Sequence, residues 1–304
     1  MSYFYENKFN KNLSMQLLSF KKQNKVKIKL VWKLRNNLGE SPIWVKNLNS
    51  IFFVDINRKK FFQYNLKNQK KLIYKVDKKI GFIAHKKKFE FILGLKGEIR
   101  FIDIKKKITL KSIKIKDHDF NRINDGKIDS EGNIWFGTMD GHERGISSGS
   151  LFCIDKKNKI HQVDKGYITP NGPAFINKNQ MFYTDSKKKT IYKIFHKKFK
   201  VRKKIIFKKF NKDLKISPDG MDVDKFGNLW VCFFRGYCVM IFDRYGKKIH
   251  KFNFPAKNIT SCTFAEKNQE KVFFTSARKT MNKKELKRYY LSGSLFSLDL
   301  DNYQ

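Results

Sequence analysis

Cysteine, proline and long apolar runs are all scarce in this chain. Its 304 residues include four cysteines, with no CxxC pair and no histidine at zinc-ligand spacing, so neither a disulfide framework nor a zinc site is indicated. No apolar stretch approaches the roughly 18 residues that a membrane span needs. The N-terminus lacks the basic-then-apolar order and the cleavage site of a secretory signal. These features predict a cytoplasmic protein with no membrane part. The cysteines lie in apolar, strand-like segments and are expected to be buried, reduced thiols: Cys153, Cys232, Cys238 and Cys262.

Acidic residues are also few, with 27 against 67 basic ones and a formal net charge of +40. A nucleic-acid binder gathers its basic residues on one face and places aromatic residues among them. Here the lysines recur in turn-like segments along the whole chain, as at 86–88, 105–107 and 187–189. We therefore interpret them as solvated turn residues and expect no nucleic-acid partner. The charge should still produce a long-range field that attracts anions at low salt.

Internal repeats replace helical periodicity in this sequence. The segment Ser148–Asp155 returns as Ser292–Asp299, 144 residues later, and the Asp-x-x-Gly-Asn-x-Trp pattern at 129–135 returns at 224–230. Both separations are multiples of a unit of roughly 48 residues, which is the size of one four-stranded propeller blade. Each unit holds short β-branched and aromatic runs between Gly, Asn, Asp or Lys turns. From Glu40 onward the length fits six such units. The sequence therefore predicts an all-β, six-bladed β-propeller with four-stranded antiparallel blades.

The last blade is one strand short, because its final run ends near residue 298. The alternating segment at 26–32 is suited to supply the missing outer strand and so to remove an exposed sheet edge. We expect residues 26–304 to form a single domain closed by this N-terminal strand. Residues 1–25 are expected to be a loosely ordered extension.

Oxygen-bearing side chains recur where successive blades begin. They occupy positions that a propeller brings into a ring around its axis: Glu40, Asn124, Asn171 and Asp219. Any one Asn-Gly or Asp-Gly pair alone is an ordinary turn signal, but the shared repeat phase favours a site. Two carboxylates and an amide would repel without a cation, and hard divalent ions prefer such oxygens. We predict one divalent metal ion bound by Glu40, Asn171 and Asp219, with Ca, Mg, Mn and Zn all allowed.

Several ordered motifs carry a family resemblance. The segments Leu38–Trp44, Asn121–Asp129 and Ser217–Asp222 resemble signatures of the gluconolactonase/regucalcin (senescence marker protein) family, and the matches run from about residue 26 to 300. The resemblance implies a six-bladed propeller with one divalent metal that hydrolyses sugar lactones to aldonic acids. The metal-binding Glu and Asn of that family fall on Glu40 and Asn171, and its catalytic Asp falls on Asp219.

The resemblance also assigns the substrate contacts. The family's Arg and Asn fall on Arg122 and Asn124. Two departures stand out: Ser41 replaces the usual Gly, and the segment 140–143 replaces an acidic pair. The family's substrate-binding Glu therefore falls on Glu143 or is lost to His142, which leaves substrate choice more open than the metal site.

The predicted function is metal-dependent hydrolysis of an aldonolactone, such as glucono-, xylono- or arabinono-lactone, with Asp219 as the base. The alternatives are a metal-dependent binding propeller without catalysis and an esterase acting on non-sugar esters. The expected partner is the small sugar lactone alone, with the protein a monomer or a weak homo-oligomer. The repeated tryptophans are expected to pack in the core rather than to stack on sugars: Trp44, Trp135 and Trp230.

Overall fold

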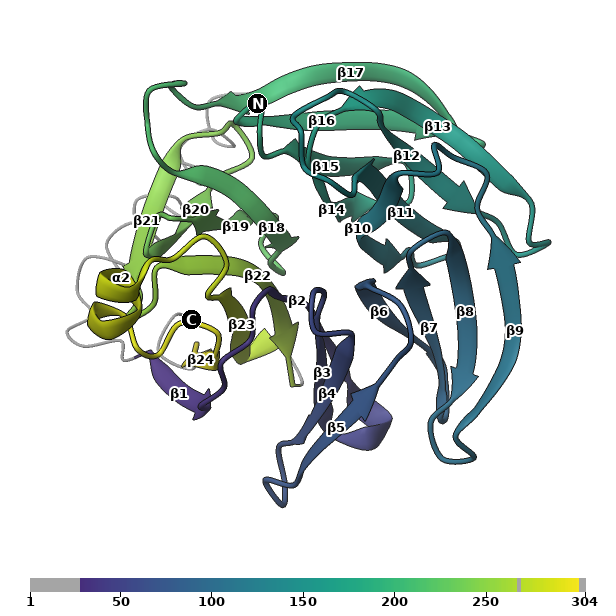
Figure 1. The fold of residues 1–304 in the computed structure, drawn as a ribbon. Coiled ribbons are helices and arrows are strands. Elements are labelled where there is room, and N and C mark those ends of the chain that lie inside the picture. Colours follow the sequence, from purple (N-terminus) through teal and green to yellow (C-terminus); the bar gives the residue numbers. More distant parts are fainter. Residues whose placement is uncertain (1–27, 267–268, 301–304) are drawn as a thin grey trace, which may run out of the picture.

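Six four-stranded antiparallel sheets surround a central axis (Figure 1). The structure, a computed structural model, describes residues 28–266 and 269–300. The first three blades are β2 (Gly39–Val45), β3 (Ser50–Asp55), β4 (Lys60–Asn65) and β5 (Lys71–Lys75); β6 (Ile80–Lys87), β7 (Glu90–Leu95), β8 (Glu98–Asp103) and β9 (Ile108–Lys114); and β10 (Asn121–Ile128), β11 (Ile134–Asp140), β12 (Gly149–Ile154) and β13 (Ile160–Tyr167).

The next two blades and the closing one complete the ring. They are β14 (Pro170–Asn177), β15 (Gln180–Asp185), β16 (Thr190–Lys197) and β17 (Lys200–Lys209); β18 (Ser217–Val223), β19 (Leu229–Phe234), β20 (Cys238–Phe242) and β21 (Lys248–Asn253); and β22 (Asn258–Ala265), β23 (Lys271–Ala277), β24 (Leu295–Asp299) and β1 (Lys29–Trp32). A 3-10 turn, η1 (Lys46–Leu48), and a short helix, α2 (Lys283–Arg288), lie outside the sheets. This confirms the predicted six-bladed, all-β propeller.

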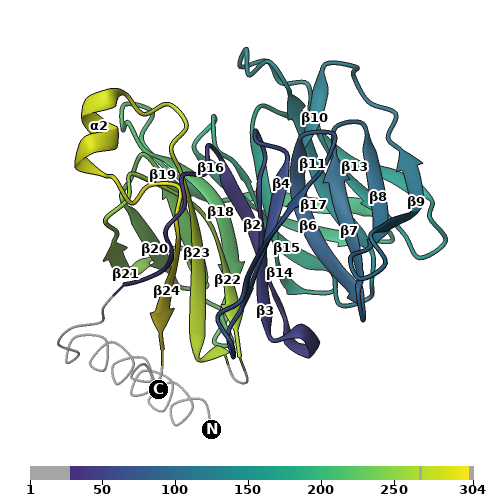
Figure 2. The ribbon, with the colours of Figure 1, turned by 60° about the horizontal axis from the view of Figure 1, so that its bottom comes forward.

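Strand β1 pairs antiparallel with β24 and so closes the ring (Figures 1 and 2). The last blade therefore combines one strand from the N-terminal part of the chain with three from the C-terminal part. Leu30 lies opposite Phe296, and Trp32 lies opposite Leu295. The predicted closing strand is therefore confirmed over Lys29–Trp32. Residues 26 and 27 and the extension at 1–25 lie outside the described residues.

The hydrophobic core consists of clusters packed between neighbouring blades. One of them joins the last blade to the first, where Trp32 meets Phe53 and Phe62 edge-on at ring-centroid distances of 6.0 and 5.6 Å. Burying a large aromatic side chain contributes several kcal/mol relative to leaving it exposed, roughly 3–5 kcal/mol by truncation to alanine. The closure therefore depends on packing between blades as well as on the β1–β24 hydrogen bonds.

The repeated Asp-x-x-Gly-Asn-x-Trp pattern is a structural turn. Asp129 Oδ2 accepts hydrogen bonds from Trp135 Nε1 at 2.8 Å and from Asn133 Nδ2 at 2.9 Å. Asp224 binds Trp230 and Asn228 in the same way at 3.0 Å. Both tryptophans are buried and Trp44 packs against the closing cluster, which confirms their assignment to the core. The four cysteines are buried, unpaired thiols, as predicted.

An irregularity recurs at one point of every innermost strand. The pairing register between the first and second strand of each blade shifts in β2, β6, β10, β14, β18 and β22. Such bulges turn the bulged strand locally and re-aim its side chains. The four ring residues predicted from the repeat phase lie at or beside these shifts.

Nowhere in 28–266 or 269–300 is a helix both long and apolar enough to cross a bilayer.

We predict that removing β1 destabilises the protein far more than removing the segment before it. A chain that begins at residue 33 exposes the β24 edge and loses Trp32 from the closing cluster, so its free energy of unfolding should fall by at least about 3 kcal/mol. A chain that begins at residue 26 is the matched control. Urea unfolding followed by circular dichroism measures both, and equal midpoints for the two chains would contradict the proposed role of β1.

Candidate metal centre and active site

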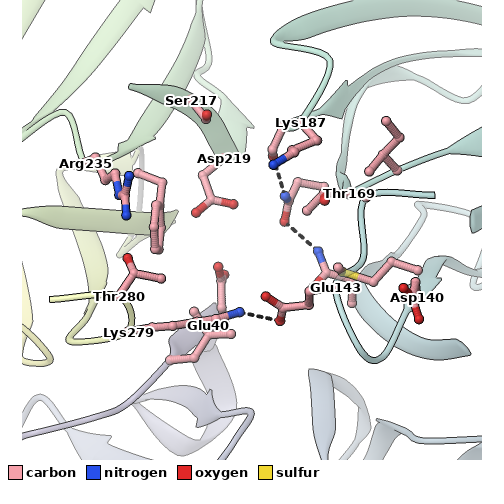
Figure 3. A pocket seen from close by; sticks show the side chains of 18 of the residues that line it. Glu40, Asp140, Glu143, Thr169, Lys187, Ser217, Asp219, Arg235, Lys279 and Thr280 are labelled. Carbon is pink, nitrogen blue, oxygen red and sulfur yellow. Dashed lines mark hydrogen bonds and ion pairs between the residues drawn. The ribbon is translucent and has the colours of Figure 1, made fainter. Parts of the chain in front are cut away.

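A cavity of about 320 Å³ opens at the axis, at the end of the propeller where the innermost strands begin. Helix α2 lies at that same end (Figure 2). The predicted site residues on β2, β10, β14 and β18 all line this cavity, as does Glu143 from the loop after β11: Glu40, Arg122, Asn124, Asn171, Asp219 and Glu143. The carboxyl groups of Glu40, Asp219 and Glu143 face a common space (Figure 3). The structure thus brings all of the predicted residues together.

Glu40 and Asp219 are buried carboxylates that form no ion pair with any residue in 28–266 or 269–300. They are 4% and 7% exposed. Desolvation by burial raises the pKa of Glu40 well above its usual range, and the negative charges of Asp219 and Asp125 raise it further. Burial and the charge of Asp125 likewise raise the pKa of Asp219. Each residue therefore gains from any cation that binds between them.

Asp125 is a third buried carboxylate that sequence reasoning missed. It is 4% exposed and accepts hydrogen bonds from the backbone N–H groups of Gly126 and Gly172, both at 2.8 Å. Desolvation raises its pKa to about 6. It fastens β10 to β14 while adding negative charge near Glu40 and Asp219. A sequence signal existed, because Asp125 precedes a glycine just as Asn171 and Asp219 do.

A chain of side-chain hydrogen bonds orients Asn171. Arg122 Nη1 donates to Asn124 Oδ1 at 2.8 Å, and Asn124 Nδ2 donates to Asn171 Oδ1 at 3.1 Å. Asn171 Nδ2 in turn donates to Ser186 Oγ at 2.7 Å, which fixes its amide with the oxygen toward Asn124. Since Asn124 Nδ2 also donates to the Pro170 carbonyl at 2.7 Å, both of its N–H groups bind protein. The structure places Asn124 as a support for Asn171.

An ion pair between the third and fifth blades bridges the channel farther along the innermost strands. Lys127 Nζ on β10 lies 2.9 Å from Asp222 Oδ1 on β18 and donates to the Met221 carbonyl at 3.1 Å. The positive charge of Lys127 also lowers the pKa of Asp125. This bridge fixes the distance between the two strands that carry Asn124 and Asp219.

The residues present fit a hard divalent ion. Glu40, Asp219 and the Asn171 amide supply oxygen ligands of the kind that Ca²⁺, Mg²⁺ and Mn²⁺ prefer. Within the described part of the chain, no group of three or more His, Cys, Asp and Glu side chains is arranged to hold a metal. The candidate set is instead two carboxylates and one amide, whose buried negative charge a cation would offset.

The model of the family described as SMP-30/Gluconolactonase/LRE-like region matches residues 38–278. The chain belongs to this family. It is 28% identical over 284 residues to regucalcin of Gallus gallus, an alignment that covers 90% of this chain and 94% of the chicken protein. The resemblance predicted from the motifs is thereby confirmed.

Two solved structures support the shared fold of the SMP-30/gluconolactonase family. A calcium-binding protein, regucalcin, from Agrobacterium tumefaciens superposes with a TM-score of 0.85 at 19% identity, covering 90% of this chain and 93% of the other. A gluconolactonase from Xanthomonas campestris gives a TM-score of 0.69 at 16% identity, covering 90% of this chain and 89% of the other. At these identities the likeness extends to the fold alone.

Ser41, where the SMP-30/gluconolactonase pattern has glycine, adopts a left-handed backbone conformation. Its φ is 47°, a region that costs a residue with a Cβ about 1 kcal/mol or more. The Ser41 hydroxyl oxygen accepts a hydrogen bond from the Ile83 N–H in the next blade at 3.3 Å. This contact partly offsets the strain and ties the bulge beside Glu40 to β6.

The second departure from the family pattern builds the loop that carries Glu143. Asp140 accepts hydrogen bonds from the Arg144 backbone N–H at 2.8 Å and from Arg144 Nε at 2.9 Å, and this pairing holds the pKa of Asp140 well below its usual range. Glu143 then stands 3.6 Å from Arg122 Nη2 and pairs with Lys279. His142 is exposed and is not among the residues lining the cavity. Of His142 and Glu143, Glu143 is therefore the residue that reaches the site. Lys279 also lines the cavity, and no repeat in the sequence identifies it as a site residue.

We predict that the metal-free protein becomes more stable when Glu40→Gln removes one buried charge. A neutral amide of the same shape should raise the free energy of unfolding by about 1–3 kcal/mol at pH 8 in the presence of a chelator. The wild type should also lose stability as pH rises from 5 to 8. Glu40 and Asp219 have folded-state pKa values above their unfolded values, so the folded state binds more protons.

Urea unfolding at several pH values measures both effects, with the exposed Glu131→Gln as the control. Added divalent metal should stabilise Glu40→Gln less than the wild type, because the amide keeps an oxygen ligand but loses the negative charge. A Glu40→Gln protein that is less stable than wild type under chelation would show that this carboxylate is not repelled in the folded state.

We further predict that Asn124→Ala weakens metal binding about 10- to 100-fold, the usual effect of losing a group that orients a ligand. Without Asn124 Nδ2, the Asn171 amide oxygen loses its side-chain donor, and the amide is held by Ser186 alone. Calorimetric titration with Ca²⁺ and Mn²⁺ measures the affinity, and Asn179→Ala, at an exposed position beyond the other end of β14, is the matched control. Equal affinities for the two variants would rule out the orienting role.

Proposed function

We propose that this protein is a sugar lactonase that binds one divalent metal ion through Glu40, Asn171 and Asp219. The observation that carries the proposal is the convergence of two buried, unpaired carboxylates and an oriented amide on one cavity beside Arg122. The names of its relatives agree with this chemistry: regucalcin in chicken and gluconolactonase in Xanthomonas campestris. The metal is one of Ca, Zn, Mg and Mn, and the Agrobacterium relative described as calcium-binding favours calcium.

The proposed reaction is hydrolysis of the internal ester of an aldonolactone. The bound metal would act as a Lewis acid toward the lactone carbonyl and lower the pKa of water. Asp219 accepts a proton from the water that attacks the carbonyl carbon. The bond from that carbon to the ring oxygen then breaks, and Asp219 returns the proton to the leaving oxygen. The product is an aldonic acid, which releases its carboxyl proton to solvent.

The environment of Asp219 is suited to this exchange. In the absence of a metal, burial and the neighbouring Asp125 raise the pKa of Asp219, and Lys279 opposes this shift. A bound cation would oppose it further and so keep the carboxylate ionised and able to accept the proton.

Arg122 and Glu143 are proposed to orient the sugar. Arg122 is 3% exposed and is held by its bonds to the Ile123 carbonyl and to Asn124. A guanidinium group fixed in this way presents its remaining donors in a defined direction. Glu143 supplies an acceptor on the opposite side of the cavity mouth from Asp219. Asn124, first expected to contact the sugar, is proposed to act through Asn171.

The remaining sequence-based expectations also stand as proposals. We propose that the protein acts in the cytoplasm, where four buried unpaired thiols would stay reduced, as a monomer or weak homo-oligomer. We propose no nucleic-acid partner. Binding to DNA or RNA would show a steep dependence on salt.

We predict that Asp219→Asn lowers kcat on aldonolactones at least about 100-fold while metal still binds, because the amide keeps an oxygen ligand but cannot accept the proton. Removal of the metal by a chelator should abolish turnover, and restoring ions singly should identify the active one. A panel of glucono-, xylono- and arabinono-lactone, followed by proton release, measures the rates. The exposed Asp213→Asn is the control.

The other candidate functions are separated by the same panel. Undiminished turnover by Asp219→Asn would remove the proposed base. Tight metal binding with no turnover of any lactone would identify a non-catalytic binding propeller. Turnover restricted to simple aryl or alkyl esters would identify an esterase.

A further inference from the structure

A second cavity, of about 720 Å³, lies beside the candidate active site and is bordered by lysines. It is formed by the connections β5–β6 and β9–β10 and by the turn between β7 and β8. Arg122 lines both cavities. The second one is bordered by seven cationic side chains and only three carboxylates. The lysines are Lys59, Lys78, Lys79, Lys96, Lys114 and Lys116, and the carboxylates are Asp77, Asp117 and Asp119.

The carboxylates of this basic cavity do little to neutralise it. Asp77 is bound by Arg100, whose Nη1 lies 2.6 Å from Asp77 Oδ1, outside the cavity lining. Asp117 accepts a hydrogen bond from Asn121 Nδ2 at 2.9 Å. Lys78 is the lining lysine that pairs with a carboxylate, Glu98 at 3.2 Å. Most of the positive charge of the lining lysines is thus not paired with a carboxylate of the described residues, and another anion is needed to offset it.

Lys79 links this basic cavity to the active site. Burial lowers its pKa, and the nearby charges of Arg122, Lys279 and Lys96 lower it further, while Glu143 opposes them. Four cations therefore act on one another around a single carboxylate, Glu143, which already contacts Arg122 and Lys279. Of the lining lysines, Lys78 and Lys79 are partly buried and the other four are exposed, so the positive charge extends from the cavity mouth inward to Arg122.

Arg122 provides an independent sign of a missing anion. It is 3% exposed, and its Nε–H is buried with no hydrogen-bond acceptor in the described structure. A buried guanidinium donor without a partner is costly, since hydrogen bonds to charged groups contribute more than neutral ones. An oxyanion in the basic cavity beside the Arg122 guanidinium would offset the buried charge of Arg122 together with the charge of the lysines.

We propose that the basic cavity is a subsite for an anionic group carried by the substrate, so that the preferred substrate is a negatively charged sugar lactone. The inference rests on the proposed lactonase function and adds the substrate class. A phosphate ester or a second carboxylate on the sugar supplies the required oxygens, and Arg122 borders the space available to both ring and substituent. A neutral lactone would bring no negative charge to Lys79 and Lys96.

The test compares kcat/KM for 6-phosphogluconolactone, glucarolactone and gluconolactone at 0.15 M salt, where long-range attraction is screened. We expect the phosphate or the carboxylate lactone to be preferred over the neutral one by at least about tenfold. The two anionic arms tell which group the subsite takes. In the double variant Lys79→Gln/Lys96→Gln the ratio should fall at least about tenfold, the effect of losing charged hydrogen bonds.

The control is Lys203→Gln/Lys209→Gln, which removes the same charge from exposed positions on the outer strand β17 and should keep the ratio. Equal kcat/KM for neutral and anionic lactones, or an equal loss in both double variants, would overturn the inference.

Titration with inorganic phosphate distinguishes failure of the anion subsite from failure of the proposed lactonase function. If no lactone is hydrolysed, but phosphate binds and is lost only from Lys79→Gln/Lys96→Gln, the anion subsite stands and the lactonase function fails. Phosphate affinity that does not change in that variant would overturn the subsite.

Discussion

Mutual repulsion among three buried carboxylates governs the centre of this propeller. Glu40, Asp125 and Asp219 come from three different blades. Burial raises the pKa of Glu40 and of Asp219, the charges of Asp219 and Asp125 raise that of Glu40 further, and the charge of Asp125 raises that of Asp219. Hydrophobic packing between blades must bring them together, because nothing in their own interaction favours it. Asp125 accepts hydrogen bonds from two backbone N–H groups, whereas Glu40 accepts one from Ser41 and Asp219 accepts one from Gly220. A propeller is well suited to this task, because its rigid blades hold strand starts at a fixed separation.

The supporting contacts are arranged around these carboxylates. The bulge in each innermost strand turns a side chain toward the axis, and the chain of bonds from Arg122 through Asn124 sets the rotation of Asn171. Below this layer, the Lys127–Asp222 ion pair spans the channel and places a positive charge near Asp125. Cationic groups thus lie beneath and beside the carboxylates. The proposed cation would bind between Glu40 and Asp219, and the proposed anion would bind farther out, near Lys79.

The sequence predicted much of this structure because repeats constrain a propeller strongly. Spacing and turn chemistry indicated six blades, and the unpaired last blade indicated a closing strand, which Trp32 and its neighbours confirm. Equal repeat phase also brought Glu40, Asn171 and Asp219 to one ring. The phase of the sequence repeats does not determine the direction in which each side chain points. Asn124 and Asp125 are adjacent, and only the bulge between Ile123 and Asp125 decides that the amide reaches Asn171 while the carboxylate turns to Gly172. Lys79 and Lys279 come from connections of irregular length, so their approach to Glu143 follows from tertiary packing.

The pairing of β1 with β24 has a consequence for how the chain reaches this structure. The two strands are separated by most of the polypeptide, so a ribosome must complete synthesis through Asp299 before the ring can close. Until then the first five blades form an open arc with two unsealed ends, and Glu40 at one end cannot yet face Asp219 across a finished channel. Long-range contacts of this kind form late and slowly. The convergence of Glu40 and Asp219, the proposed metal ligands, is thus expected to be among the last features of the structure to be assembled.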